Sequence, residues 1–376
     1  MDLEQLQGQI PRSPERIEQH NAEQRRVWEA FRAGRPIRPP VTIGMNVRMI
    51  LLDPALNEAG ISFERYTLDP ATMMEVQLRF AHWVRHEWWF DHEMGLPADG
   101  WSLAVDYQNM YEAAWLGAPI HFPPGNCPYA SPLLVGDRKR LLLERGVPDA
   151  FQDGGWMQRM WDSYEYLRRQ QESGYEFASR PIRQVEPCGT GTDGPFTLLM
   201  ALRGGEACVD MLEDPDYFAE MMELIVEATV GRIRAFRRHL GRAIRSDDFA
   251  YADDSIALLS VEQVRRYILP YHRKLIDQLW TGRGQLSIHL CGDASRHFAL
   301  LREELGVTGF DTGFPIDLHA VRRRLGPEVL LQGGPAVELL RQGPIERIVA
   351  EVGRLLAGPA AEGRFVLREG NNLAPG

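Results

Sequence analysis

Short apolar runs alternate with longer amphipathic segments along most of this chain. Each apolar run has the length of a buried strand, and each amphipathic segment repeats its apolar positions at helical spacing. Glycine, proline and short polar loops separate the two kinds of segment. The apolar runs predict eight strands, at residues 41–45, 101–106, 184–189, 249–252, 286–288, 308–311, 329–333 and 364–368.

Helix-capping residues mark the starts and ends of several amphipathic segments. Ser13 is a good cap for a helix that runs to about Phe31. Ser260 and Gln263 have the spacing of a capping box, in which each side chain bonds the other residue's backbone. Glycines stand where later helices should end, at Gly306, Gly326 and Gly358. These signals place helices between most of the predicted strands.

Regular alternation of strands and helices with short loops implies right-handed crossovers and a parallel sheet. Eight such units predict an α/β protein, a single (β/α)8 TIM-type barrel. An open doubly wound sheet is the competing interpretation. Against it, no Gly-x-Gly-x-x-Gly follows the first strand, and the glycine-rich stretch 190–194 lacks the Lys-Ser/Thr of a phosphate loop.

The whole chain, residues 1–376, is predicted to form one barrel domain with two additions. Residues 1–40 form an N-terminal helical segment. Residues 117–155 form a long proline-rich insertion, which we expect near the C-terminal mouth because long loops usually cover a site. A complete barrel also has a helix after its last strand, whereas Gly376 follows the last predicted strand closely. We expect either that the N-terminal helix covers this position or that the polypeptide has been shortened.

Composition and charge narrow the class of protein. Hydrophobic residues make up 44% of the chain and charged residues 25%, as in soluble globular proteins. The formal net charge of -10 argues against a general affinity for nucleic acid or anionic membranes. No apolar run approaches the length of a membrane span, and the polar N-terminus carries no signal peptide. Four widely spaced cysteines suit a reducing cytoplasm, with thiols free or bound to metal.

Polar and titratable residues recur at the carboxyl ends of the predicted strands. In a (β/α)8 barrel the chemistry takes place at these ends, whereas a purely structural barrel has little need of polar groups there. Each residue also has a simpler interpretation as a helix cap, an ion pair or a buried hydrogen-bonded group. The strand ends hold Asn46, Asp106, residues 190–193, Asp253, Asp254, His289, Cys291, Asp311, Gln332 and Glu369. We expect one cavity to contain Asn46, Asp106, Asp253, His289, Cys291 and Gln332.

The stretch 285–293 carries the strongest candidate for metal binding. Side chains two residues apart on a strand point to the same face, so His289 and Cys291 present an imidazole and a thiolate together. This is half of a tetrahedral zinc site. Gly292 then lets the chain turn, and Asp293 can cap the following helix. In an isolated pair of this kind, the histidine is more often a hydrogen-bonded residue of the core than a metal ligand. The surrounding sequence decides between these two interpretations.

Several motifs together resemble the uroporphyrinogen decarboxylase superfamily. That group contains tetrapyrrole decarboxylases and zinc-dependent methyltransferases that act with corrinoid proteins. The resemblance covers about the last half of the chain well and the first half loosely, and it implies a TIM-type barrel, in agreement with the strand count. The matching stretches are 192–197 (Thr-Asp-Gly-Pro-Phe-Thr), 258–264 (Leu-Leu-Ser-Val-Glu-Gln-Val), 268–271 (Ile-Leu-Pro-Tyr), 289–293 (His-Leu-Cys-Gly-Asp) and 370–376 (Gly-Asn-Asn-Leu-Ala-Pro-Gly).

Two features place the chain nearer the methyltransferase branch. The decarboxylases carry Arg-Gln-Ala-Gly-Arg-Tyr near the first strand, whose arginines hold substrate carboxylates, whereas this region offers Arg48 alone. The methyltransferases carry His-x-Cys at the fifth strand, matched by His289 and Cys291, and a second cysteine after the last strand. Asn371 stands at that second position, and Glu369, two residues away, offers a charged oxygen instead. The resemblance therefore implies a zinc site made by His289, Cys291 and Glu369.

On this resemblance the leading hypothesis is a zinc-dependent methyltransferase. A methyl group would pass between a small substrate and a corrinoid (cobalamin-type) or thiol acceptor. The expected partners are a small-molecule methyl donor or acceptor and a corrinoid protein, with a homodimer left open. The strand ends and the resemblance together give catalytic candidates and substrate-binding candidates. The catalytic candidates are Asp106, Asp253 and Asn46, and the substrate-binding candidates are Arg48, Thr192, Asp193, Asp254, Asp311 and Gln332.

Two alternatives stay open. A decarboxylase of a uroporphyrinogen-like tetrapyrrole acid would use Asp106 to stabilise a protonated pyrrole and arginines to bind carboxylates, but its arginine motif is missing. A catalytically degenerate barrel that binds a corrinoid or small ligand is favoured by Asn371 at the expected cysteine position. Metal content separates the methyltransferase from both alternatives.

Overall fold

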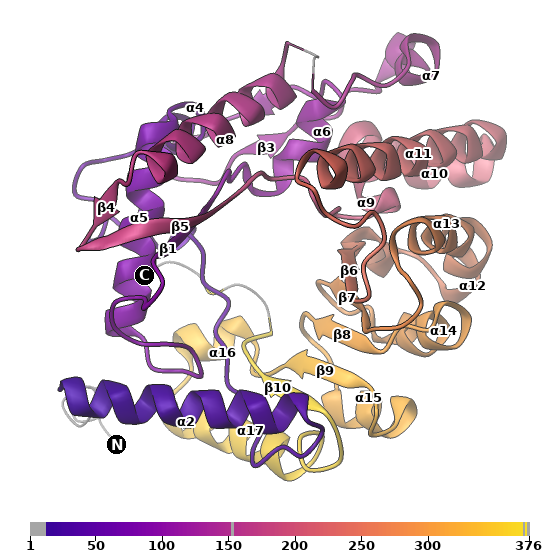
Figure 1. Ribbon diagram of the computed structural model, residues 1–376. Coiled ribbons are helices and arrows are strands. Elements are labelled where there is room, and N and C mark those ends of the chain that lie inside the picture. The colour runs from indigo at the N-terminus through magenta and orange to yellow at the C-terminus, as the bar shows by residue number, and fades with distance from the viewer. Residues whose placement is uncertain (1–12, 152–153, 371–372, 374–376) are drawn as a thin grey trace.

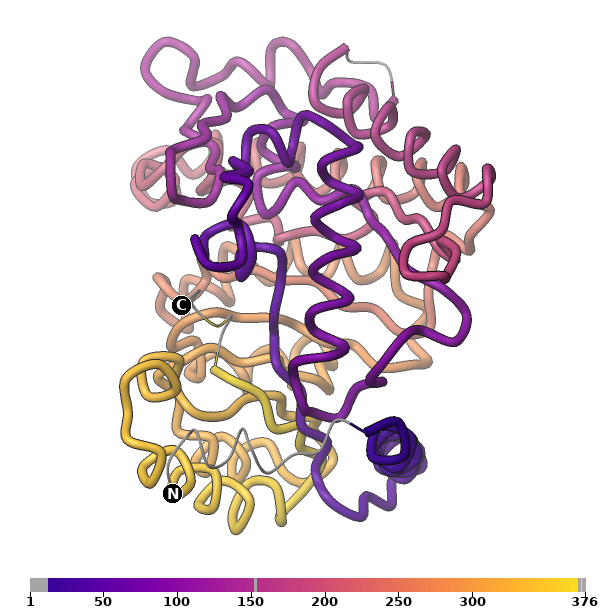
Figure 2. Tube along the Cα trace, turned by 90° about the vertical axis from the view of Figure 1, so that its left-hand side faces the viewer, coloured from indigo at the N-terminus to yellow at the C-terminus, as the bar shows by residue number. Residues whose placement is uncertain are grey.

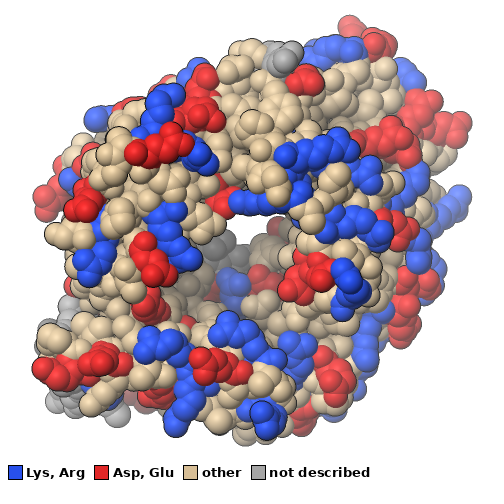
Figure 3. Space-filling model, in the orientation of Figure 1, with Lys and Arg blue, Asp and Glu red and all other residues tan. Residues whose placement is uncertain are grey.

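The computed structural model describes residues 13–151, 154–370 and 373. Strands and the helices that follow them surround a central opening (Figure 1). Residues 48–186 and residues 249–370 lie on different sides of it, while residues 14–32 lie on the side of the C-terminal part, as the view turned by 90° also shows (Figure 2). The opening is visible between the side chains too, with acidic and basic residues around it (Figure 3). The predicted α/β class is confirmed.

One side of the opening, which we call the C-terminal wall, is a five-stranded parallel sheet in the order β10-β9-β8-β7-β6. Helical segments connect each strand to the next. The strands are β6 (Phe249–Ala252), β7 (Leu286–Leu290), β8 (Gly309–Thr312), β9 (Leu330–Gly333) and β10 (Phe365–Leu367). The helical segments are η3 (Asp254–Leu258), α12 (Val261–Gln263), η4 (Val264–Ile268), α13 (Leu269–Leu279), α14 (Ser295–Leu305), α15 (Leu318–Leu325), α16 (Val337–Gln342) and α17 (Ile345–Ala357).

The other side, the N-terminal wall, contains β1 (Trp101–Ala104) paired in parallel with β5 (Arg180–Glu186), together with the segment 40–48. A short strand, β4 (Glu176–Phe177), pairs antiparallel with β5. Helices cover these strands on the outside (Figure 1). The helical segments of this part are α3 (Arg48–Leu51), α4 (Phe63–Leu68), α5 (Pro70–Glu87), η1 (Gln108–Met110), α6 (Tyr111–Trp115) and α8 (Trp156–Glu172).

Three helices lie between the two walls and carry the insertion. They are α9 (Pro195–Arg203), α10 (Glu206–Glu213) and α11 (Pro215–His239). The described part of the insertion contains the hairpin β2 (Ile120–His121) and β3 (Tyr129–Ala130), η2 (Gly136–Arg138) and α7 (Leu141–Arg145). The backbone N–H of Leu134 bonds the carbonyl of Leu202, and the guanidinium of Arg203 bonds the carbonyl of Leu134, so the insertion is fastened to α9.

The closed barrel that the sequence predicts is only partly formed by backbone pairing. Among the described residues, the first predicted strand is reduced to an isolated parallel bridge between Val41 and Leu367. The N–H of Thr42 still bonds the carbonyl of Leu367, but the N–H groups of Val41 and Gly44 donate to the carboxylates of Asp91 and Glu369. Between β5 and β6 the described link is one bond, from the N–H of Ala252 to the carbonyl of Thr192, 3.2 Å. The order of strands around the opening follows the prediction, and full closure stays a prediction.

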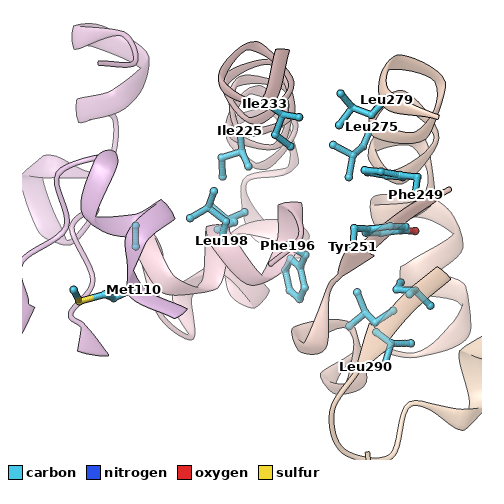
Figure 4. Packing of buried hydrophobic residues seen from close by; sticks show 14 of the residues in the cluster. Met110, Phe196, Leu198, Ile225, Ile233, Phe249, Tyr251, Leu275, Leu279 and Leu290 are labelled. Atoms are coloured by element: carbon cyan, nitrogen blue, oxygen red, sulfur yellow. The ribbon is translucent and has the colours of Figure 1, made fainter. Parts of the chain in front are cut away.

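The main core is one cluster of buried apolar residues that runs through both walls, between the strands and the helices that cover them. Apolar side chains of α9, α11 and α13 pack against β6 and β7, as the labelled residues in Figure 4 show. Along β7 the side chains of Leu286, Ile288 and Leu290 are buried in this core, whereas Ser287 and His289 are half-buried on the other face. This alternation fixes which side chains face the opening.

The N-terminal helix α2 (Pro14–Arg32) packs on the inner face of the C-terminal wall. Its Phe31 forms a small cluster with Leu330 and Val366, and Trp28 packs against that cluster. Because Leu330 lies two residues before Gln332 on the same strand, Phe31 covers the amino ends of the strands while polar residues occupy the carboxyl ends. No helix in the described ranges is both long enough and apolar enough to cross a membrane.

Candidate functional site

His289 and Cys291 lie together at the carboxyl end of β7, as the sequence predicts. The imidazole Nε2 of His289 is 3.0 Å from the Sγ of Cys291. Strand alternation turns both side chains to the inner face, and each is half-buried. The pair is therefore not packed in an apolar core, which was its simpler interpretation.

Asp254 completes a group of three ligands at this point. It is the first residue of η3, directly after β6, and its Oδ1 accepts a hydrogen bond of 2.7 Å from the N–H of Cys291. That oxygen also lies 3.9 Å from Nε2 of His289. One ligand atom from each of Asp254, His289 and Cys291 lies within 4.8 Å of the others. In the described part of the chain this is the group of three that could hold a metal ion.

The spacing and chemistry of these three atoms fit zinc. A tetrahedral ion with nitrogen, oxygen and sulfur ligands separates neighbouring ligand atoms by about 3.4–3.6 Å. The separations of Nε2 of His289 from Sγ of Cys291 and from Oδ1 of Asp254 are 3.0 Å and 3.9 Å, which lie on either side of that value. Imidazole, thiolate and carboxylate are all zinc ligands, and three protein ligands leave a fourth position open. In this group the carboxylate comes from Asp254, whereas the resemblance implies Glu369.

Both carboxylate oxygens of Glu369 accept hydrogen bonds from groups outside the proposed metal site. Its Oε1 accepts from Nη2 of Arg368 at 2.8 Å, and its Oε2 accepts from the N–H of Gly44 at 2.8 Å. Only 1% of its side chain is exposed. Both oxygens are therefore occupied by donors that a metal ion would have to displace, and Glu369 is absent from the group of close ligand atoms among the described residues. Asn371 lies outside the described residues.

A charged pair lies behind His289. Asp311, at the end of β8, accepts from Nδ1 of His289 at 2.8 Å, and Nη1 of Arg368 donates to both of its oxygens at 3.0 Å. Burial disfavours charge on the imidazole, but the hydrogen bonds to Asp311 and Cys291 outweigh it and raise the pKa of His289 to about 10. A metal ion that binds Nε2 must therefore displace a proton.

Asp193 lies near the same group and carries a perturbed carboxyl. Burial, followed by the negative charges of Glu112 and Asp254, raises the pKa of Asp193 to about 7. The loop is held by Glu112, whose Oε2 accepts from the N–H of Asp193 at 2.7 Å and from the hydroxyl of Thr192 at 3.1 Å. Glu112 in turn pairs with Arg232 at 2.6 Å. A carboxyl with this pKa can hold or release a proton at neutral pH.

Asp253, expected to be catalytic, points away from His289. Its carboxylate is fully buried and accepts from the backbone N–H groups of Phe196 and Thr197 at the start of α9, and Nε2 of His272 lies 2.7 Å away. It therefore caps a helix in the core instead of lining the cavity. Neighbouring residues on an extended chain point in opposite directions, so only one of Asp253 and Asp254 can face the opening.

Asp106, Arg48 and Asn46 form a separate group on the N-terminal wall. Asp106 accepts from the hydroxyl of Tyr66 at 2.7 Å and from the backbone and side-chain amides of Gln108 at 2.9 and 2.6 Å. Arg48 donates its Nε to Gln108 Oε1 at 2.7 Å, and Asn46 accepts from the N–H of Arg48 at 2.9 Å. Gln108 has φ of 51°, a left-handed conformation that non-glycine residues adopt mainly under functional or packing constraint.

Gln332 lies on the inner face next to the site. It is paired in register with Asp311 on the neighbouring strand, which in turn pairs with His289. Registered neighbours in a parallel sheet share a face, so the three side chains form one row across β7, β8 and β9. The structure brings the predicted strand-end residues His289, Asp311 and Gln332 together in this row, and their function stays a prediction. Sequence reasoning missed Arg232, Glu112, Tyr66 and the role of Arg368. The spacing of these four carries no motif, because their partners are far away in the chain.

Comparison with known proteins places the chain in context. The model of the uroporphyrinogen decarboxylase (URO-D) family matches residues 22–376. Among solved structures, a methyltransferase from Methanosarcina mazei superposes with a TM-score of 0.60 at 16% sequence identity, covering 93% of each chain. At that identity the likeness shows the fold alone. No curated protein sequence matches the chain.

Proposed function

This chain belongs to the uroporphyrinogen decarboxylase family, and from that premise we propose that it is a zinc-dependent methyltransferase. It would transfer a methyl group between a small substrate and a corrinoid or thiol acceptor. The family's members include decarboxylases and methyltransferases, and this membership supports an enzymatic role. The cytoplasm is the proposed compartment, because no disulfide joins the cysteines among the described residues.

The convergence of Asp254, His289 and Cys291 is the observation that carries this proposal. These residues would hold the zinc ion, with the fourth position left for a substrate atom. Bound there, zinc would lower the pKa of a substrate thiol so that it reacts as a thiolate at neutral pH. A decarboxylase that works with acid and arginine groups alone has no use for a thiolate and an imidazole in contact.

The remaining residues of the site would bind, orient and protonate. Asp193, with its pKa near 7, would take or return the proton of the substrate's reacting group. Asp311 and Gln332 continue the row of polar side chains along which a substrate would lie. A corrinoid on a partner protein would approach this row through the central opening (Figure 3).

Decarboxylation of a tetrapyrrole acid is the second candidate, and the fixed carboxylate of Asp106 is the observation in its favour. Three hydrogen bonds hold that carboxylate in one orientation. An anchored anion suits the stabilisation of a cationic pyrrole intermediate. In the same part of the wall only Arg48, among the described residues of the segment 40–48, carries a guanidinium for substrate carboxylates.

Zinc content of the purified protein tests the proposal. We expect about one zinc ion per chain by elemental analysis, and loss of zinc in Cys291→Ser and Asp254→Asn, since each change removes a ligand. Cys208→Ser is the matched control, because Cys208 is half-buried against Met200 and far from the site in sequence. Glu369→Gln should keep at least part of its zinc.

A wild-type protein that stays zinc-free after incubation with zinc would overturn the proposal. Turnover of a porphyrinogen by that protein would then support the decarboxylase. Absorbance changes with cobalamin but no turnover would support a barrel that only binds its ligand.

A further inference from the structure

We propose that Glu369, Arg368 and Asp311 form a charged chain that positions His289 for metal binding. The inference rests on the proposed zinc site and assigns these three residues a role other than ligation. This series of charged side chains starts at the backbone of Gly44 on the N-terminal wall and ends at the imidazole of His289 on the C-terminal wall. It is built from residues on β8, on the end of β10 and on the segment 40–48.

The first link decides which nitrogen of His289 is available. Asp311 carries a negative charge next to Arg368, so it accepts the proton on Nδ1 at 2.8 Å. That bond leaves Nε2 facing Cys291 at 3.0 Å and Asp254 at 3.9 Å. A carboxylate behind a ligating histidine fixes the ring orientation and makes the coordinating nitrogen more basic.

The second link holds Asp311 in this orientation. Nη1 of Arg368 lies 3.0 Å from both oxygens of the Asp311 carboxylate. Without this cation, Asp311 could rotate toward the metal and compete with the three ligands. Arg368 therefore keeps Asp311 as a hydrogen-bond acceptor for His289, and its planar guanidinium fixes the direction of the carboxylate better than an ammonium would.

The third link fixes Arg368 through Glu369. Nη2 of Arg368 donates to Oε1 of Glu369, and the N–H of Gly44 donates to Oε2, both at 2.8 Å. A Cβ atom on Gly44 would lie 2.3 Å from Oε1 of Glu369 and 2.5 Å from Nη2 of Arg368. Glycine is thus the residue that lets this backbone approach the pair, and Glu369 is the buried end of the chain.

Zinc affinity and cobalt spectra of single variants test the inference. Asp311→Asn should lower zinc affinity by about 10–100-fold in competition with a chelator, as the loss of such supporting groups does elsewhere. Glu369→Gln and Gly44→Ala act one step further away, so we expect about tenfold or less. In the cobalt-substituted protein all three should shift the visible absorption bands, which report the geometry of the ligands.

Two comparisons control for general damage. Glu351→Gln removes one partner of an exposed pair with Arg354 and should change neither affinity nor spectrum. Arg368→Lys keeps the charge but loses the contact with both oxygens of Asp311, so its zinc affinity should lie between those of wild type and Asp311→Asn. This variant replaces Gly44→Ala in the test if Gly44→Ala does not fold.

Proton NMR of the metal-free protein gives a reading that does not depend on zinc. The Nδ1 proton of His289, hydrogen-bonded to Asp311, should be protected from exchange in wild type and should move upfield in Asp311→Asn. Wild type that fails to bind zinc would overturn the proposed function, and the NMR signal would still decide the positioning role. Wild type that binds zinc while Asp311→Asn and Glu369→Gln match it in affinity, cobalt spectrum and NMR would overturn the inference alone.

Discussion

The two walls of the opening place their polar residues by different means. On the C-terminal wall, continuous backbone pairing from β6 to β10 sets His289, Asp311 and Gln332 in one row. On the N-terminal wall, β5 pairs with β1 and β4 and, among the described residues, with no strand of the other wall, and the segment 40–48 contacts β10 through an isolated bridge. There, side-chain hydrogen bonds from Tyr66 and Gln108 hold Asp106 in place.

The comparison teaches where local patterns suffice. In a parallel sheet, residues paired in register point to the same face. Side chains of neighbouring strands that end at the same height therefore lie next to one another. A group held by side chains depends on partners far apart in the chain, each of which can be lost singly. We therefore expect single changes at the strand ends of the C-terminal wall to alter stability little. A single change on the N-terminal wall, or at its junction with α11 through the buried Glu112–Arg232 ion pair, should cost what the removed contact contributes.

Breaking the buried ion pair between Glu112 in α6 and Arg232 in α11, the junction of the N-terminal wall with α11, should lower the unfolding free energy most. Arg232→Met leaves Glu112 without its 2.6 Å partner, and the two side chains are 0% and 2% exposed. An unpaired buried charge of this kind costs about 3–5 kcal/mol of unfolding free energy. Urea unfolding would measure the loss.

Arg168→Met is the control for the junction variant, because Arg168 pairs with Glu172 on the surface of α8. Exposed pairs of this kind contribute at most about 1 kcal/mol. Equal urea midpoints for the two variants would show that the Glu112–Arg232 pair does not hold the walls together.

The pH dependence of stability should sharpen the comparison on the C-terminal wall. His297 in α14 is 0% exposed, and burial, followed by the charge of Arg296, lowers its pKa to about 4. Its unfolded pKa is about 6.5, so the unfolded chain binds the proton first and stability falls as the pH drops from about 6.5 towards about 4. His297→Gln should remove up to about 1 kcal/mol per pH unit of that slope.

Thermal or urea unfolding at several pH values would measure the slope. His121→Gln, on the exposed hairpin of the insertion, is the control and should leave the slope of wild type. A slope unchanged in His297→Gln would mean that His297 is protonated equally in the folded and unfolded chains.

The smallest effect is expected from trimming the N-terminal wall. Tyr66→Phe removes the hydrogen bond to Asp106 and an acceptor for Gln77, which lies 3.2 Å from the hydroxyl. Loss of one such bond costs about 1 kcal/mol. Tyr129→Phe, at a side chain that is 53% exposed, should cost nothing measurable in the same unfolding experiment. Equal stability of both variants would show that Tyr66 does not hold Asp106.

The sequence by itself determined the α/β class, the order of strands and the pairing of His289 with Cys291. Each of these follows from local periodicity or from spacing within one strand, and both depend only on residues close together in the sequence. The sequence also predicted that Asp254 and Asp311 lie at the carboxyl ends of their strands.

Only the tertiary structure decided how these residues are used. Asp253 and Asp254 are adjacent carboxylates that the sequence alone does not distinguish. The start of α9 donates hydrogen bonds to Asp253, whereas Asp254 accepts from the N–H of Cys291. Glu369 is two residues from the expected cysteine position, yet Arg368 and Gly44 occupy both of its oxygens. The incomplete pairing of the first strand has the same origin, because the carboxylates that bind its N–H groups lie 50 and 325 positions away in the chain. Contacts over such separations depend on packing, which no local pattern encodes.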